Sequence, residues 1–260
     1  MGRFFLLCIC LLCVQCGDFT LSPYISDAPN YKHNSHDLKK IQDIEASTNS
    51  SFKIAVFSDT HDYYDELKDN IKYINSHKDE YAFVIVTGDI TNIGLLSEFE
   101  TFKDFMDELE IPYILTIGNH DLLTNGGEIF SQMFGKTTFY FDFKQTRFIL
   151  YNNNNWESSY PVPDDDWLEN ALSTSGQTHN IMFSHVSVLD DARFTEEQMN
   201  SFQSMTDSYN VKYQVNGHDH NPDESSFGNS QKVTVGAASK KVFLELSISD
   251  GGVSHDFVYP

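Results

Sequence analysis

The sequence predicts an α/β (α+β) fold in which two β-sheets pack face to face and helices cover their outer faces. Three observations lead to this prediction. Residues 52–117 alternate short apolar runs with stretches of helical periodicity, and residues 139–258 are richer in strand-like runs. Polar side chains gather directly after the predicted strands, at the edge where open α/β sheets bind their ligands.

The first half of the predicted domain alternates regularly. Residues 52–57, 82–86 and 113–117 are nearly continuous apolar runs of strand length, as expected for strands buried on both faces. Between them, apolar side chains recur at helical spacing over residues 67–74 and 99–109. This alternation predicts parallel strands with helices on the faces of the sheet.

The second half predicts more strands and fewer helices. Residues 139–143 and 147–151 are expected to form a hairpin around Lys144-Gln145. The asparagine run at residues 152–155 is interpreted as a loop, and a helix is expected from Trp167 onward, after an acidic stretch. Further strands are expected at residues 181–183, 213–215, 233–236, 242–248 and 253–258. Together these strands predict a second sheet stacked on the first.

Residues 1–16 have the pattern of an export signal. Arg3 is followed by an apolar run over residues 4–14, which is shorter than the roughly 20 residues that a membrane-spanning helix needs. A basic start and a short apolar run are typical of a secretory signal peptide. All four cysteines lie in this segment, so no thiolate ligand and no disulfide framework are expected in the rest of the chain.

The stretch Val14-Gln15-Cys16-Gly17 resembles a degenerate lipobox of bacterial lipoproteins. The resemblance implies lipidation of Cys16 and an exported protein anchored in the cell envelope, facing the periplasm or the cell surface. An ordinary cleaved signal or an N-terminal anchor is the alternative. Residues 17–51 are polar and rich in turn-forming residues, which predicts a flexible tether. The folded domain is expected over residues 52–260.

The chain is strongly acidic, with a formal net charge of -21 from 17 Lys+Arg and 38 Asp+Glu. Nucleic-acid binding depends on basic residues that neutralise phosphates, so no nucleic-acid-binding surface is expected. A phosphate substrate is also an anion, and bound metal ions are the obvious source of local positive charge.

Possible metal ligands follow five of the predicted strands in chain order. A single aspartate in such a place is usually a helix cap, and a single histidine is usually a surface residue. Here, however, five of the ten histidines fall in these segments, together with carboxylate and amide side chains. Glycines beside them would let the backbone approach closely. Carboxylate, imidazole and amide groups at one edge of a sheet predict a metal site. The segments are Asp59-Thr60-His61, Gly88-Asp89, Gly118-Asn119-His120-Asp121, Ser184-His185 and Gly217-His218-Asp219-His220.

This set of segments is similar to that of the calcineurin-like metallophosphoesterases. The resemblance covers residues 52–260 and implies a four-layer β-sandwich flanked by helices, with the metal site at the C-terminal strand ends. It also implies two divalent metal ions and a hydroxide between them that attacks phosphorus, with His120 as general acid. The ligands that it implies are Asp59, His61 and His220 for the first metal, Asn119, His185 and His218 for the second, and Asp89 for both.

Two departures from related patterns concern Asn92. Many relatives have an aspartate at this position that orients the general acid, and the purple acid phosphatases have a tyrosine ligand there. A neutral amide can still hydrogen-bond the ring of His120 but raises its pKa less than a carboxylate does, so good leaving groups should be favoured. Ligands of N and O type suit Mn, Fe(II) or Zn. Asp121 is expected to position the turn that carries Asn119 and His120.

The expected function is hydrolysis of phosphate mono- or diesters. A dedicated cyclic-nucleotide or phospholipid-headgroup phosphodiesterase is the main alternative. Base stacking would need exposed aromatic residues near the metals, and Tyr63, Tyr64 and Trp156 are the candidates. A catalytically silent binding scaffold is a third possibility, which the complete set of ligands disfavours.

Overall fold

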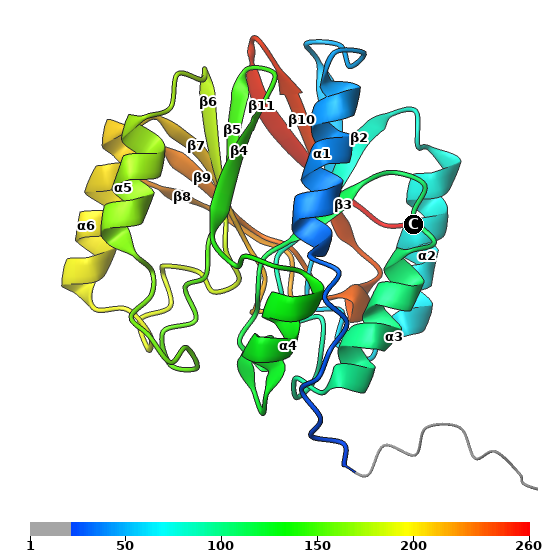
Figure 1. The fold of residues 1–260 in the computed structure, drawn as a ribbon. Coiled ribbons are helices and arrows are strands. Elements are labelled where there is room, and N and C mark those ends of the chain that lie inside the picture. Colours follow the sequence, from blue (N-terminus) through cyan, green and yellow to red (C-terminus); the bar gives the residue numbers. More distant parts are fainter. Residues whose placement is uncertain (1–21) are drawn as a thin grey trace, which may run out of the picture.

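The structure is a computed structural model and describes residues 22–260. The expected signal peptide, Cys16 and the first part of the expected tether lie outside the described residues. Within residues 22–260, no helix is both long enough and apolar enough to cross a membrane. The described part of the chain begins at the lower edge of the molecule in Figure 1 and folds into layers of sheet and helix.

The first sheet has five strands and joins the beginning of the domain to its end. The three strands from the first half of the domain run parallel to one another. The two C-terminal strands extend the sheet on the other side, each antiparallel to the strand before it. The apolar runs of the sequence therefore form the parallel strands that were predicted. In order across the sheet, the strands are β11 (Gly252–Val258), β10 (Phe243–Ser249), β1 (Phe52–Phe57), β2 (Tyr81–Val86) and β3 (Tyr113–Leu115).

The second sheet has six strands. The predicted hairpin is present at one edge, with Phe143 opposite Thr146, and its second strand is followed across the sheet by three strands parallel to it. The short strand β8 was not predicted, because its sequence is polar and mostly exposed. In order, the strands are β4 (Phe139–Phe143), β5 (Thr146–Leu150), β6 (His179–Phe183), β7 (Val211–Asn216), β9 (Ser230–Thr234) and β8 (Asp223–Phe227).

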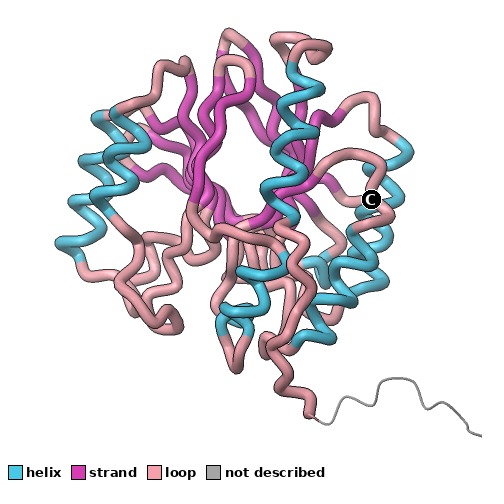
Figure 2. The backbone as a smooth tube through the Cα atoms, in the orientation of Figure 1, coloured by secondary structure: helices cyan, strands magenta, loops and turns pink. Residues whose placement is uncertain are grey.

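Figures 1 and 2 show four layers, with the two sheets in the middle and helices outside. Three hydrophobic clusters hold these layers together. One cluster fills the space between the two sheets and includes Phe83 and Phe148, whose rings are 5.4 Å apart. The second packs three helices on the outer face of the first sheet, and the third packs two helices on the second sheet. These helices are α2 (Tyr64–Ser76), α3 (Leu96–Met106) and α4 (Gly126–Met133), then α5 (Asp165–Ser173) and α6 (Glu196–Ser208). The predicted sandwich flanked by helices is confirmed.

The prediction of a flexible tether is wrong for the part that forms α1 (His33–Glu45). This helix covers the free edge of β3 with polar side chains. Asn34 accepts from Leu115 N at 2.9 Å and donates to Leu115 O at 2.8 Å, while Asp37 accepts from Tyr113 N at 3.0 Å. These side chains replace a neighbouring strand and satisfy the backbone of the edge strand. The buried positions of this helix are thus largely polar, so its sequence lacks the apolar repeat by which a buried helix is predicted.

Candidate metal centre

The parallel strands that precede the expected ligands end toward the lower edge of the molecule in Figure 1, and all seven ligands follow these strand ends in the sequence. Asp59 and His61 follow β1, Asp89 follows β2 and Asn119 follows β3. From the second sheet, His185 follows β6, and His218 and His220 follow β7. The structure gathers six of these residues into two groups whose candidate ligand atoms lie within 4.8 Å of one another. The first group is Asp59, His61 and His220, and the second is Asp89, His185 and His218.

The remaining expected ligand and the contacts between the groups complete one continuous centre. Asn119 Oδ1 lies 3.0 Å from His218 Nδ1, which places the amide in the second group. Asp89 Oδ2 lies 3.0 Å from His185 Nε2 and 3.9 Å from His61 Nε2 in the first group. Asp89 therefore stands between the two groups, as expected for a carboxylate shared by two cations.

The chemistry of these donors fits divalent cations. His61 Nε2 faces His220 Nε2 at 3.4 Å, and His185 Nε2 faces His218 Nδ1 at 3.3 Å. Ring nitrogens that face each other at this distance converge on one positive charge, either a shared proton or a metal ion. The set of imidazole, carboxylate and amide donors without thiolate suits first-row transition metals.

Backbone carbonyls orient two of the imidazole rings. His61 Nδ1 lies 3.0 Å from Thr91 O, and His185 Nδ1 lies 2.9 Å from Thr87 O. A carbonyl can only accept, so Nδ1 donates in both cases and Nε2 presents its lone pair to the centre. This is the arrangement by which proteins fix the tautomer of a metal-binding histidine.

Buried charges make the centre attractive to cations. Burial raises the pKa of Asp59, which is fully buried. Burial alone would also raise the pKa of Asp89, but the charge and hydrogen bond of His185, together with the charges of His120 and His61, lower this pKa to about 2. Conversely, burial would lower the pKa of His185, and Asp89 raises it to about 9. Buried carboxylates of this kind need a positive charge beside them, and divalent cations supply it.

The backbone at five of the seven ligands lies in the left-handed region that L-residues rarely adopt. The φ angles are 48° at Asp59, 46° at His61, 51° at Asp89, 73° at His218 and 59° at His220. Such conformations persist only where surrounding contacts enforce them, and they gather at functional sites. Here the contacts include a 2.6 Å hydrogen bond from Ser58 Oγ to Asp59.

Two glycines allow the strand ends to approach one another. A Cβ atom at Gly118 would come within 2.1 Å of Asp89, and one at Gly217 would come within 2.0 Å of Ser58 and 2.5 Å of Asp59. Only glycine avoids both clashes. The interpretation of these glycines as points of close backbone approach is confirmed.

His120 lies beside the two groups, and its imidazole is hydrogen-bonded to no member of either group. Its ring is 4.9 Å from that of His61, and its backbone N–H donates to Asp89 at 2.8 Å. Its Nδ1 donates to the main-chain carbonyl of Asn92 at 2.6 Å. The expected contact from position 92 is therefore made by the backbone carbonyl, not by the side-chain amide. Either group leaves Nε2 free to act on a substrate.

Glu98 holds the loop that carries this carbonyl. Its carboxylate accepts from the backbone N–H groups of Asn92 at 3.0 Å, Ile93 at 3.3 Å and Leu95 at 2.9 Å. The sequence analysis missed this residue. It lies three residues after the N-cap Leu95, as in a capping box, but a leucine at the N-cap lacks the oxygen that marks this motif in a sequence, so no sequence signal indicated it.

Asp121 binds backbone and no expected ligand, as predicted. Its carboxylate accepts from Thr91 N at 2.9 Å, from Ile90 N at 3.0 Å and from Gly118 N at 2.9 Å. Burial, and next the charge of Asp89, raise the pKa of Asp121 to about 7. This residue ties the loop after β2 to the turn that carries Asn119 and His120.

The asparagine loop also connects the two sheets. Asn154 is fully buried and donates to Ile117 O at 2.9 Å, beyond the end of β3. Asn153 donates to Val186 O at 2.6 Å, beyond the end of β6. Residues 152–155 form a loop as predicted, but its role in holding the strand ends together was missed.

The three aromatic candidates have different surroundings. Tyr64 stacks on Phe105 with ring centroids 5.0 Å apart, so it packs within the helical layer. Tyr63 is partly exposed, and its ring lies 6.4 Å from that of His61. Trp156 is well exposed and covers the guanidinium of Arg193 at 4.4 Å.

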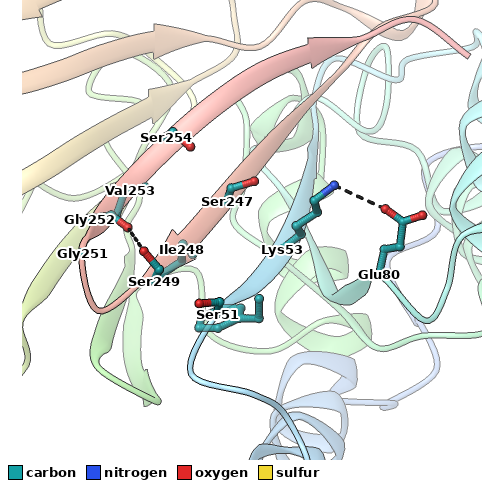
Figure 3. A pocket seen from close by; sticks show the side chains of 11 residues that line it. Ser51, Lys53, Glu80, Ser247, Ile248, Ser249, Gly251, Gly252, Val253 and Ser254 are labelled. Atoms are coloured by element: carbon teal, nitrogen blue, oxygen red, sulfur yellow. Dashed lines mark hydrogen bonds and ion pairs between the residues drawn. The ribbon is translucent and has the colours of Figure 1, made fainter.

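A groove of about 880 Å³ lies beside the centre. It is lined by Ile117 and Leu122 next to the His120 turn, by α4, and by the loop that contains Tyr160. Figure 3 shows a second hollow, of about 750 Å³, between the β10–β11 hairpin and the start of β1. This hollow contains the Lys53–Glu80 ion pair at 3.3 Å and lies at the opposite end of β1 from Asp59. The groove is the nearer of the two to the metal centre, because Ile117 and Leu122 flank the turn that carries His120, but neither hollow is lined by His120 or by an expected ligand.

Two adjacent groups of nitrogen and oxygen donors at the strand ends of this sandwich define a metal-dependent phosphohydrolase with a dinuclear site. The chain belongs to the calcineurin-like phosphoesterase family, whose sequence profile matches residues 52–222. A probable cyclic nucleotide phosphodiesterase of Xenorhabdus bovienii is 24% identical over 187 residues, 63% of this chain and 70% of that protein. A probable glycerophosphodiester phosphodiesterase of Arcobacter nitrofigilis is 38% identical over 64 residues, 25% of this chain and 23% of that protein.

Solved structures share the fold. A purple acid phosphatase from yellow lupin superposes with a TM-score of 0.67 at 14% identity, covering 82% of this chain and 52% of its own. GAP50 of Plasmodium, titled the anchor in the inner membrane complex, superposes with a TM-score of 0.62 at 13% identity, covering 80% of this chain and 84% of its own. At these identities the likeness concerns the fold alone, and the chain spans about half the length of the lupin enzyme.

Proposed function

We propose that this protein hydrolyses phosphodiesters, with Asp59, His61 and His220 holding one divalent cation, Asn119, His185 and His218 a second, and Asp89 both. The observation that carries the proposal is the pair of ligand groups joined through Asp89, with the free Nε2 of His120 beside them. The native metals are proposed to be Mn, Fe(II) or Zn, the ions that suit this donor set.

The reaction divides between the cations and His120. Two bound divalent cations supply Lewis acidity, which activates water and neutralises charge on the phosphoryl oxygens. Water adds to phosphorus and the bond to the leaving alcohol breaks. His120 Nε2 donates the proton that the leaving oxygen takes up. The Asn92 carbonyl keeps Nδ1 protonated and so directs Nε2 toward the substrate.

One observation supports a diester over a monoester. The curated relatives named above are both phosphodiesterases by name. Monoester hydrolysis is the first alternative. The anchor-type neighbour of similar fold keeps a silent scaffold as the second.

The proposed location is the cell envelope. The apolar run at residues 4–14 and the lipobox-like segment at Cys16 support export and lipid anchoring. Mass spectrometry of the protein isolated from its own cells tests this: a diacylated N-terminal cysteine supports the proposal, and an unmodified N-terminus contradicts it.

A rate comparison tests the reaction. The protein is stripped of metal, refilled with Mn, Fe(II) or Zn, and assayed on p-nitrophenyl phosphate and bis-p-nitrophenyl phosphate. Faster turnover of the diester is the expected result. Faster turnover of the monoester would make the protein a phosphatase, and metal binding without turnover of either compound would favour the scaffold.

The variant His120→Ala separates enzyme from scaffold further. It should keep both metals yet lose about 10²- to 10³-fold in turnover, the usual contribution of a general acid. His36→Ala, at an exposed histidine on α1, is the matched control and should retain full activity. Equal rates for the two variants would exclude a catalytic role for His120.

A further inference from the structure

Exposed apolar side chains gather around the metal centre. Among residues 22–260, ten large hydrophobic side chains are exposed. Eight of them lie in the N-terminal segment or in loops that follow β1, β2, β3, β5 and β6 at the ligand-bearing edge. One of the eight, Tyr31, packs against Lys103, whose Nζ lies 5.0 Å from its ring. Single exposed apolar residues are ordinary, but a group around one site marks an interaction surface. The other seven, here called the apolar rim, are Tyr24, Tyr63, Ile93, Leu123, Trp156, Tyr160 and Leu189.

Backbone contacts join the segments that carry one side of the apolar rim, from the N-terminal segment to the metal centre. Asn125 donates to Tyr24 O at 2.9 Å, and Thr124 donates to Ile93 O at 2.8 Å. Gly94 packs directly against the carbonyl of Leu123. The loop that contains Ile93 also presents the carbonyl that holds His120.

The other side of the apolar rim reaches the centre through Arg193. Trp156 covers this guanidinium, and its indole is 62% exposed. Arg193 is in turn 3.6 Å from Asp190, whose carboxylate lies 4.0 Å from His218 Nε2. Apolar side chains therefore flank the metal centre on two sides.

The N-terminal segment leads to the same edge. Residue 22 lies at the lower edge in Figure 1, near α4 and the ligand-bearing loops. Five residues lie between it and Cys16, and the six residue-to-residue steps span at most about 20 Å. A chain anchored at Cys16 would hold this edge close to the membrane. The net charge of -21 opposes contact with an anionic surface, which leaves an uncharged or zwitterionic one.

We propose that the apolar rim rests on the surface of a zwitterionic bilayer, so that the metal centre faces the membrane and acts on phosphodiesters in lipid headgroups. The substrate class rests on the phosphodiesterase function proposed above. The contact with the membrane surface does not, because it depends on the apolar rim, on the position of residue 22 and on the anchor proposed at Cys16.

Quenching of Trp156 by bromine tests the contact. The full-length chain is reconstituted into phosphatidylcholine vesicles with or without brominated acyl chains. Tryptophan emission should fall in brominated vesicles, and this loss should disappear in Trp156→Phe, which keeps Trp167. A tryptophan introduced by Asp250→Trp in that variant, at the β10–β11 turn of the opposite edge, should not be quenched. Absence of Trp156 quenching, or equal quenching at position 250, would overturn the proposal.

Kinetics provide the second arm. Tyr24→Ser combined with Leu189→Ser should lower hydrolysis of a vesicle-borne phosphodiester about tenfold and leave hydrolysis of soluble bis-p-nitrophenyl phosphate unchanged. Weaker binding of the soluble diester with unchanged vesicle hydrolysis would overturn the proposal in favour of a soluble apolar substrate. If the unaltered chain hydrolyses neither compound, the proposed function fails, while the fluorescence result still decides the membrane contact.

Discussion

The two ligand groups differ in how firmly the fold holds them. In the second group His185 is fully buried, and its ring is fixed by Thr87 O. In the first group the side chain of His220 is 44% exposed, and its Nδ1 forms no hydrogen bond with any of residues 22–260. An exposed ring without an outer hydrogen bond loses more freedom on binding a metal, and outer hydrogen bonds typically change metal affinity 10- to 100-fold. The second group should therefore bind its metal more tightly.

The largest effect is expected from removing the buried ligand. His185→Ala should empty the second group and lower turnover by at least about a hundredfold, whereas His220→Ala should lower it about tenfold and respond to added metal. Elemental analysis and turnover of the diester measure both effects. His36→Ala is again the control. A larger loss in His220→Ala would reverse the ranking of the two groups.

Chelation should remove the two metals in separate steps. During titration with a chelator, the metal held by the exposed His220 should leave first, while the one beside His185 remains. Metal content and activity measured on the same samples should show activity lost with the first ion. Simultaneous loss of both ions would mean that the shared Asp89 makes the groups one unit.

Glu98→Gln should weaken the general acid without disturbing either metal. The amide can accept fewer of the backbone hydrogen bonds that fix the Asn92 loop, so His120 should be less well oriented. Turnover should fall about tenfold, and most for poor leaving groups. A series of aryl phosphodiesters measures the dependence on leaving group. Glu100→Gln, at an exposed position of the same helix, is the control, and an unchanged dependence would disprove the role of Glu98.

Asn34→Ala should act on stability rather than on chemistry. It leaves the buried backbone of Leu115 without its partners, at a cost of about 2 kcal/mol. Since β3 leads to Asn119, metal loss from the second group should become easier on warming. Urea unfolding gives the free energy, and Lys39→Ala on the exposed face of α1 is the control. Equal unfolding midpoints would show that α1 contributes nothing to the edge strand.

Acid should weaken the contact of α1 slightly. Burial lowers the pKa of His33 below its usual 6.5, so the unfolded chain takes up a proton before the folded one. Stability from this group is therefore present above pH 6.5 and declines as the pH falls below that value. Urea midpoints at pH 7 and pH 5.5 should differ less in His33→Gln than in the unaltered chain. An equal difference would assign the acid sensitivity to other groups.

Sequence patterns predicted the parallel strands, the helices α2, α3 and α5, and the residues that the structure gathers at the metal centre, but not α1, α4 or α6. Apolar runs such as residues 82–86 are buried on both faces and therefore leave a clear pattern, and ligand types after strand ends are visible in order. By contrast, α1 buries polar side chains, and α6 has few buried positions despite the Thr195–Gln198 capping box. The orienting contacts of Thr87, Thr91 and Asn92 are made by backbone carbonyls, which any residue could provide.

The position of β10 between β1 and β11 has a consequence for biosynthesis. Strand β1 is among the first elements of the domain to leave the ribosome, yet its partner on one side, Phe243–Ser249, is among the last. Until then a hydrogen-bonding edge of the nascent chain stays open, and pairing so distant in sequence forms slowly. Because the first sheet is completed late, the polypeptide stays unfolded for longer, which would be useful if it crosses a membrane before folding.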